Sequence, residues 1–225
     1  PSPKVEKGML LIQNRSSLIS AGTEKMLIDF GKGSYLQKAR SQPDKVKMVL
    51  NKIKTDGFWS TYDTVKSKLD QPLPLGYSSA GVVVAVGDGV DAFKVGDRVV
   101  SNGPHAEVVL VPENLCCKIP DEVGFDEAAF TVVGAIALQG IRLIKPTFGE
   151  TVVVTGLGLI GLIASQILIS NGCNVVGLDF DQSKVDLAKS WGVQAYNAAG
   201  GADVVKVVEE LTDGVGADAV LITAS

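Results

Sequence analysis

Short apolar runs separated by turn residues make up most of this chain, and their period changes along it. Within residues 5–30 and 73–120, runs such as VVVAVG, GDRVV and AEVVLVP alternate with turn residues such as Gly, Pro, Asn and Asp. This alternation predicts the short strands of a β-rich domain. From about Phe130 to the end, strand-like runs alternate with helix-like runs, which predicts an α/β domain.

Residues 31–72 interrupt the β-rich region with a helical pattern. Pro43 suits the first position of a helix. Two apolar stripes then recur at helical spacing: Val46, Val49, Leu50 and Ile53, followed by Phe58, Tyr62, Val65 and Leu69. The segment therefore predicts a helical lobe inserted into the β-rich domain.

The clearest signal lies in residues 151–181, TVVVTGLGLIGLIASQILISNGCNVVGLDFD. An apolar strand leads into Gly156, Gly158 and Gly161, which have GxGxxG spacing. A helical pattern follows, and a second apolar strand ends at Asp179. A strand, a glycine turn, a helix, a strand and an acidic residue in this order predict a Rossmann-type dinucleotide-binding domain.

Each residue of this motif has a physical role. Gly156 permits the tight turn, Gly158 lets the backbone approach a pyrophosphate, and Gly161 lets the helix pack close to the strand. The helix N-terminus offers N–H groups and the positive end of its dipole to the phosphates. Asp179 can accept hydrogen bonds from both ribose hydroxyls and would repel a 2′-phosphate, so NAD is preferred over NADP.

Four further residues are expected to contact the cofactor, namely Leu159, Ile160, Lys184 and Thr223. Lys184 is equally well explained as an exposed surface lysine.

More strand and helix patterns follow, with helices at 186–191 and 204–211 and strands at 193–196 and 219–222. They bring the domain to four strands, whereas a complete dinucleotide-binding domain of this type has about six. A sheet that ended here would have an unprotected edge. We therefore expect these residues to belong to a longer protein.

Charge is distributed unevenly along the chain. The net charge is −4; residues 31–72 hold nine Lys/Arg and four Asp, which is +5, so the remainder carries −9 (−4 minus +5). The basic segment is either a solvated lobe or a basic rim that attracts an anionic substrate or a partner. The overall charge argues against a nucleic-acid partner.

Other sequence features exclude membrane insertion and secretion. No apolar run is long enough to span a bilayer, and the N-terminal residues lack the pattern of a signal peptide. Cys116, Cys117 and Cys173 do not have the spacing of a zinc site. We expect all three cysteines to pack as small apolar residues, and we expect a cytoplasmic location.

GVVVAVGDGVDAFKVGDRVV in the first region and GLGLIG in the second resemble the medium-chain dehydrogenase/reductase superfamily. The resemblance implies a GroES-like catalytic domain over residues 1–129, with the insertion at 31–72. It also implies an NAD-binding Rossmann domain, a doubly wound parallel sheet, over residues 130–225 and truncated at its C-terminal end. Members of this superfamily transfer a hydride between the cofactor and a small-molecule substrate, and many dimerise through later strands.

Zinc-dependent members of this superfamily have three metal ligands that this chain lacks. Their cysteine segment matches residues 21–24 (AGTE), their His-Glu pair matches Tyr77 and Ser78, and their third ligand falls near Thr131 or Val132. Catalytic zinc needs three protein ligands of the N, S or O type. The four-cysteine structural zinc lobe is also missing, so the resemblance implies no metal.

A narrower resemblance comes from SAGTEK, GYSSAGVVVAVG and the helical insertion between them. They are similar to bacteriochlorophyllide dehydrogenase-like proteins and to two-part bacterial oxidoreductases of polysaccharide pathways. This implies a role in sugar or polysaccharide metabolism without identifying a substrate.

Without zinc, side-chain hydroxyl, carboxyl or imidazole groups must bind the substrate oxygen and carry its proton. The candidates are Thr23, Glu24, Tyr77, Ser78 and His105. By the resemblance, Thr23 replaces a proton-relay hydroxyl, and Tyr77 and Ser78 line the cleft that the metal would fill. Structural explanations compete: Thr23 and Glu24 can cap a turn, Tyr77 can be a wall residue, and His105 can be a structural histidine.

Two functions from different classes remain open at the level of sequence. The first is a zinc-independent, NAD-linked oxidoreductase that acts on an alcohol or carbonyl; a variant of it is an NADPH-dependent quinone or enoyl reductase. The second is a non-catalytic dinucleotide-binding or scaffold module. The intact GxGxxG and Asp179 favour an enzyme, and turnover distinguishes the two classes.

Overall fold

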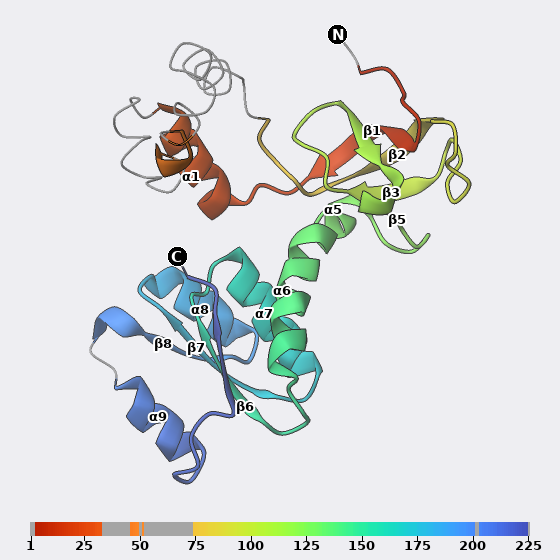
Figure 1. The fold of residues 1–225 in the computed structure, drawn as a ribbon. Coiled ribbons are helices and arrows are strands. Elements are labelled where there is room, and N and C mark those ends of the chain that lie inside the picture. The colour runs from red at the N-terminus through yellow and green to blue at the C-terminus, as the bar shows by residue number, and fades with distance from the viewer. Residues whose placement is uncertain (1–2, 33–45, 50, 52–73, 201–202, 225) are drawn as a thin grey trace. The chain divides into compact units, whose positions relative to one another are not determined.

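The computed structural model describes residues 3–32, 46–49, 51, 74–200 and 203–224 (Figure 1). The chain divides into two compact units. The first contains residues 1–18 and 77–225, and the second contains residues 19–76. Each unit is described by itself.

Five short strands of the first unit form an antiparallel sheet in the order β4-β1-β2-β3-β5. Their bounds are β1 Met9–Ser17, β2 Ser79–Val86, β3 Arg98–Ser101, β4 Val108–Pro112 and β5 Cys116–Lys118. β1 and β2 lie side by side although about sixty residues separate them in the chain. The expected β-rich region is thus confirmed, and one face of this sheet packs around Leu10, Ile12 and Val83.

Four parallel strands of the same unit form a second sheet in the order β8-β7-β6-β9. Their bounds are β6 Thr151–Thr155, β7 Asn174–Asp179, β8 Gln194–Asn197 and β9 Ala219–Ile222. The helices around it are α6 Thr131–Ile144, α7 Leu159–Ser170, α8 Gln182–Ser190 and α9 Val204–Leu211. The short elements α5 Phe125–Ala128, η1 Glu113–Leu115 and η2 Ala198–Gly200 complete the described part of this unit.

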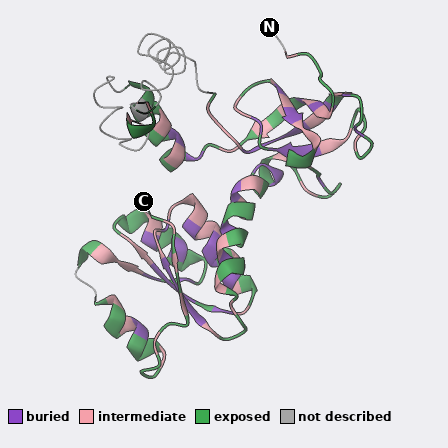
Figure 2. Cartoon of the chain, in the orientation of Figure 1, coloured by how far each residue is buried: buried purple, intermediate pink, exposed green. Residues whose placement is uncertain are grey.

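Alternate residues of β6 face opposite sides of the parallel sheet, and both sides are covered. Val152 and Val154 belong to the core cluster that includes residues of α6, α7 and α8. Val153 packs instead with Val176 and with Val208 of α9. Helices therefore cover both faces, which confirms the doubly wound Rossmann arrangement, and the buried residues concentrate along these strands (Figure 2).

Helix α1, Ala21–Lys32, lies in a region where the sequence pattern predicted β-rich structure to about residue 30. Ser20 explains the difference, because its N–H donates to Glu24 Oε1 at 2.8 Å while the Glu24 N–H donates to the Ser20 carbonyl at 2.9 Å. The first bond satisfies a backbone donor at the helix N-terminus, and the second is the first i→i−4 bond of the helix. Most of the expected helical insertion lies outside the described residues, although 46–49 and 51 are helical.

Helix α8 includes most of the expected helical residues 186–191 and ends at Ser190; it begins at Gln182, where the Asp181 carboxylate accepts from the Ser183 N–H at 2.9 Å and caps it. One smaller expectation needs correction. Cys117, on the edge strand β5, is exposed and not packed, whereas Cys173 is buried. Within the described residues, no helix has both the length and the apolar character needed to cross a membrane.

Candidate cofactor-binding and catalytic sites

The loop between β6 and α7 carries the three glycines of the GxGxxG motif, and each has a different environment. Gly156 has φ +92°, a conformation that L side chains rarely adopt. A Cβ on Gly161 would lie 1.8 Å from the Gly156 carbonyl oxygen, so only glycine allows α7 to approach the loop this closely. A Cβ on Gly158 would have no atom within 4 Å. The space beside Gly158 is therefore open to a ligand, as the motif predicts.

The N-terminus of α7 differs from those of α8 and α9. Asp181 and Asp203 cap the latter two through side-chain hydrogen bonds. Gly158 caps α7, and its first turn holds no acidic residue. The partial positive charge of this helix end is thus not neutralised by a carboxylate of its own first turn, which favours an anionic ligand.

Asp179 lies at the carboxyl end of β7, next to this loop. Its Oδ2 accepts from the Leu157 N–H at 2.7 Å and its Oδ1 accepts from the Asp181 N–H at 2.9 Å. Lys184 Nζ lies 3.6 Å from the same carboxylate, which is only 11% exposed. Burial raises the pKa of Asp179, but the two N–H donors and the Lys184 charge outweigh burial and lower the pKa overall. Asp179 is therefore ionised at neutral pH and is held in a fixed position.

Thr223, just after β9, supports the loop from the other side. Its hydroxyl donates to the Gly156 carbonyl at 2.7 Å and to the Thr155 carbonyl at 3.2 Å. Thr223, which the sequence predicts to contact the cofactor, thus holds the glycine turn in place through these hydrogen bonds.

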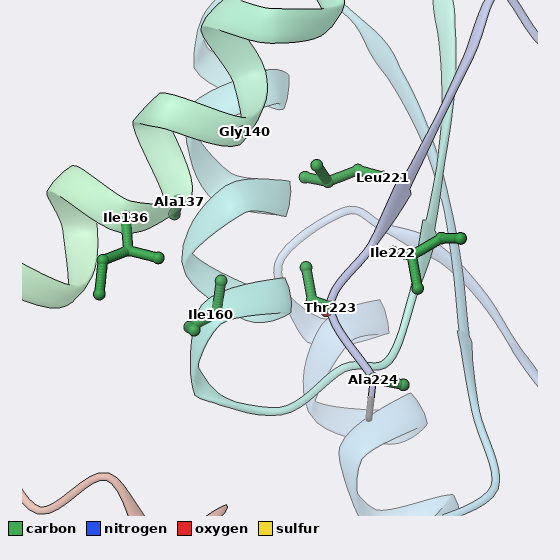
Figure 3. A pocket seen from close by; sticks show the side chains of 8 residues that line it. All are labelled: Ile136, Ala137, Gly140, Ile160, Leu221, Ile222, Thr223 and Ala224. Carbon is green, nitrogen blue, oxygen red and sulfur yellow. The ribbon is translucent and has the colours of Figure 1, made fainter. Parts of the chain in front are cut away.

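A cavity of about 320 Å³ opens beside the loop (Figure 3). Leu221 points from β9 toward α6, where Gly140 lets the two elements approach closely: a Cβ on Gly140 would lie 2.9 Å from Leu221 Cδ1. Ile160 of α7 and Thr223 lie at the glycine-loop end of the cavity. The full lining is Ile136, Ala137, Gly140, Ile160, Leu221, Ile222, Thr223 and Ala224. The lining side chains are apolar apart from Thr223, which suits a flat heteroaromatic ring.

Tyr77 and Ser78 directly precede β2 of the antiparallel sheet. Ser78 is 1% exposed, and its hydroxyl donates to the Ala129 carbonyl at 2.5 Å. This bond ties β2 to the residue that ends α5. The Ser78 hydroxyl therefore acts as a structural tie, while Tyr77 is half-buried.

His105 comes to the same end of this sheet. Its Nδ1 lies 2.9 Å from Ser17 Oγ. Ser17 is the last residue of β1 and pairs with Ser79, and the Leu18 N–H donates to the Ser78 carbonyl at 2.9 Å. The sheet thus brings His105 to the strand ends that carry Tyr77 and Ser78, which lie far from it in sequence.

Thr23 and Glu24 belong to the second unit, in the first turns of α1. Glu24 is 5% exposed and bonds the Ser20 N–H, and Ser20 Oγ lies 3.5 Å from Thr23 Oγ1. Within its own unit, Glu24 thus bonds a backbone group at the start of the helix, whereas the Thr23 hydroxyl has, among the described residues, only the Ser20 hydroxyl as a hydrogen-bonding neighbour.

Among the residues that the structure describes, no cluster of three or more His, Cys, Asp or Glu side chains could hold a metal ion. The positions that match zinc ligands by resemblance carry Ala21, Tyr77 and Ser78, and near the third ligand Thr131 and Val132.

Sequence reasoning missed two groups that matter at these sites. The Leu157 N–H occupies a variable position of GxGxxG, so no residue type could reveal it. Ser17 is one of many serines, and only strand pairing brings it to His105.

Comparison with known families matches both regions of the chain. Residues 46–121 match the family model described as an alcohol dehydrogenase GroES-like domain. Residues 160–225 match the model described as a zinc-binding dehydrogenase.

Individual relatives agree with these matches. A sorbitol dehydrogenase of Halalkalibacterium halodurans is 32% identical over 183 residues, which cover 67% of this chain and 53% of the relative. The structure of a mycobacterial quinone oxidoreductase superimposes with a TM-score of 0.67 at 27% identity, covering 98% of this chain and 60% of that one. A mycobacterial protein in complex with NADPH gives 0.65 at 27% identity, with coverage of 98% and 60%. This chain spans about half the length of the curated relatives it matches.

Proposed function

Because the chain belongs to the medium-chain dehydrogenase/reductase superfamily, we propose that it is an NAD(P)-dependent oxidoreductase acting on an alcohol or carbonyl. The observation that carries the proposal is the glycine loop. Three features meet at one edge of the parallel sheet: the open space at Gly158, the α7 N-terminus with no acidic residue in its first turn, and the ionised Asp179. These groups match a pyrophosphate and an adjacent ribose.

The chain's residues fit a dinucleotide in three parts. The backbone around Gly158 would bind the pyrophosphate, Asp179 with Lys184 would hold the adenosine ribose, and the apolar cavity near Ile160 would take the nicotinamide ring. When bound, the nicotinamide supplies the hydride chemistry, while the protein orients it and excludes water.

We propose NAD over NADP on the basis of charge. Asp179 carries a negative charge that a 2′-phosphate would meet at short range. The relative bound to NADPH shows that this fold also accepts the phosphorylated cofactor. Direct comparison of the two nucleotides therefore tests this part of the proposal.

We also propose that the reaction proceeds without zinc. Tyr77, His105, Thr23 and Glu24 offer hydroxyl, imidazole and carboxyl groups for binding a substrate oxygen and moving its proton. Ser78, whose hydroxyl is bonded to Ala129, contributes by fixing the start of β2. Activity and thermal stability should remain unchanged on addition of a chelator or zinc; a chelator-sensitive activity would contradict zinc independence.

The substrate class that we propose is a small alcohol or carbonyl of sugar metabolism, supported by the similarity to sorbitol dehydrogenase and by the polysaccharide-pathway resemblance. An anionic substrate would suit the basic segment 31–72. The same proposal includes a GroES-like domain over residues 1–129 and a Rossmann domain over residues 130–225. It also includes a cytoplasmic location and homo-oligomerisation.

Fluorescence titration with NADH and NADPH side by side tests the cofactor site. Tight NADH and weaker NADPH binding is expected. Turnover with a panel of polyols, aldehydes and ketones then tests the activity. Binding without turnover would favour a scaffold role. Quinone reduction with NADPH would favour the reductase alternative, which the similarity to a quinone oxidoreductase supports.

A further inference from the structure

We propose that Ser17 and Asn14 are positioning residues that hold His105 ready to exchange a proton with the substrate. The inference rests on the proposed oxidoreductase function and assigns His105 two supporting residues on β1. It arises from an unusual concentration of hydrogen bonds around one short loop, residues 102–107, which carries the chain's only histidine.

Asn14 fixes the backbone on both sides of His105. Its Nδ2 donates to the Ala106 carbonyl at 2.8 Å and to the Pro104 carbonyl at 3.3 Å. The Asn14 N–H also donates to the Glu107 carbonyl at 2.9 Å. A single residue of β1 therefore bonds the carbonyl before His105 and the two carbonyls after it.

In this arrangement, one polar atom of the Asn14 side chain lacks a hydrogen bond. Its Oδ1 is buried and has no hydrogen-bond partner among the described residues. A buried polar atom without a partner is unfavourable for stability. The cost arises because the amide directs its Nδ2 at the Pro104 and Ala106 carbonyls, so the bonds to the loop offset it.

Hydrogen bonds and close packing hold the first residues of this loop against the antiparallel sheet. The Gly103 N–H donates to Ser101 Oγ at 3.2 Å, and Ser101 Oγ lies 3.0 Å from Ser79 Oγ. A Cβ on Gly103 would lie 2.7 Å from Val109 Cγ2, so only glycine fits there. The residues that precede His105 are thus held by contacts with the sheet as well as by Asn14.

The hydroxyl of Ser17 suits an imidazole that changes its charge. A hydroxyl donates to an unprotonated Nδ1 and accepts from a protonated one. A carbonyl partner would require a hydrogen on Nδ1, and a carboxylate would favour the imidazolium. Ser17 can therefore hold the ring at 2.9 Å in either state, which a proton-exchanging group needs.

The residue before Ser17 on β1 bonds a different element. The Ser16 hydroxyl donates to Asp126. Because Ser16 and Ser17 project to opposite faces of the strand, Asp126 and His105 bond β1 from different sides. Ser16 therefore provides a matched control for Ser17.

In the oxidation direction, the His105 imidazole, starting as the Nδ1–H tautomer, would accept the substrate hydroxyl proton at Nε2, and a bound nicotinamide would supply the hydride acceptor. The imidazolium would then give the Nδ1 proton to Ser17 Oγ, and the Ser17 hydroxyl proton would pass to water. Proton exchange of the imidazole with solvent then restores the Nδ1–H tautomer. The C–H and O–H bonds of the alcohol break, and a carbonyl, a reduced cofactor and one solvent proton form. Reduction follows the same route in reverse.

Nitrogen-15 NMR of the 225-residue chain, labelled at histidine, tests the pairing without any substrate. Three-bond couplings of the labelled histidine report how far the imidazole is held in the rotamer that bonds Ser17. Ser17→Ala should lower the population of that rotamer by about threefold or more, the factor that one net hydrogen bond supplies. Ser17→Thr keeps a hydroxyl and should retain the wild-type population, and Ser16→Ala should do the same.

Kinetics of the same variants test the role in the reaction. Ser17→Ala and Asn14→Ala should lower kcat about tenfold or more with little change in KM, and Ser17→Thr should restore it. An unchanged population of the bonded His105 rotamer in Ser17→Ala, with normal wild-type turnover, would overturn the positioning role alone. Wild-type protein that turns over no substrate would overturn the proposed function and the proton transfer together.

Discussion

The carboxylate of Asp179 accepts a hydrogen bond of 2.7 Å from the backbone N–H of Leu157, in the centre of the glycine loop. The residue expected to bind the ribose therefore also holds the turn expected to bind the pyrophosphate. Loop position and ribose contact are coupled through one side chain, so a change at Asp179 acts on both.

Replacing Asp179 by Ala should raise the Kd for NADH about tenfold or more and should affect NADPH less. The ribose bonds and the loop support are lost for both nucleotides, but the repulsion of a 2′-phosphate is removed only for NADPH. Fluorescence titration measures both constants. Asp186→Ala, on the exposed face of α8, is the matched control; equal weakening of the two nucleotides by Asp179→Ala would contradict the assigned role.

The same substitution at two glycines should have opposite consequences. Gly158→Ala places its Cβ in open space and should cost about 1 kcal/mol or less of stability, while weakening NADH binding strongly. Gly161→Ala drives its Cβ into the Gly156 carbonyl and should destabilise the fold by about 2 kcal/mol or more. Denaturation and nucleotide titration of both variants check this. Nucleotide affinity retained in Gly158→Ala would place the pyrophosphate elsewhere.

Asp97 should make the antiparallel sheet sensitive to acid. Its pKa is lowered, first by the Lys94 N–H and then by Lys118, whose Nζ lies 3.0 Å away. A lowered pKa contributes stability above the unfolded value of about 3.9, and this contribution is lost as the pH falls through the folded value.

Asp97→Asn should therefore be less stable than wild type at pH 7, and the difference should shrink as the pH falls below about 4. Denaturation at a series of pH values measures it. Asp91→Asn, exposed in the same β2–β3 connection, should show no such trend. A deficit that persists unchanged into acid would mean that the Asp97 charge is not its source.

The adjacent thiols on β5 should react at different rates. Burial, together with the neighbouring Cys117, raises the pKa of Cys116 to about 11, so almost none of it is thiolate at neutral pH. Cys117 is exposed. Iodoacetamide at pH 8 should modify Cys117 first, as peptide mass spectrometry can follow. Preferential labelling of Cys116 would contradict the placement of these side chains.

Most of the cofactor site could be predicted from sequence because its parts are local. Gly156, Gly158, Gly161 and Asp179 stand at spacings that follow from one strand, one turn and one helix. The positive φ of Gly156 and the tight fit at Gly161 agree with the expected turn and helix packing, while the cofactor contacts of Gly158 and Asp179 stay predictions. The candidate catalytic residues had no such spacing. Ser78 was interpreted as a substrate-binding hydroxyl, yet its bond to Ala129 depends on how α5 packs against β2.

The sequence by itself determined the order in which strands and helices alternate along the chain of the parallel-sheet region, because an apolar period is a property of neighbouring residues. It determined the glycine turn for the same reason. Only the tertiary structure decided that Thr223 holds that turn by hydrogen bonds and that β1 presents Ser17 and Asn14 to the loop of His105. Strand pairing and packing join residues far apart in the chain, and no local pattern encodes such contacts.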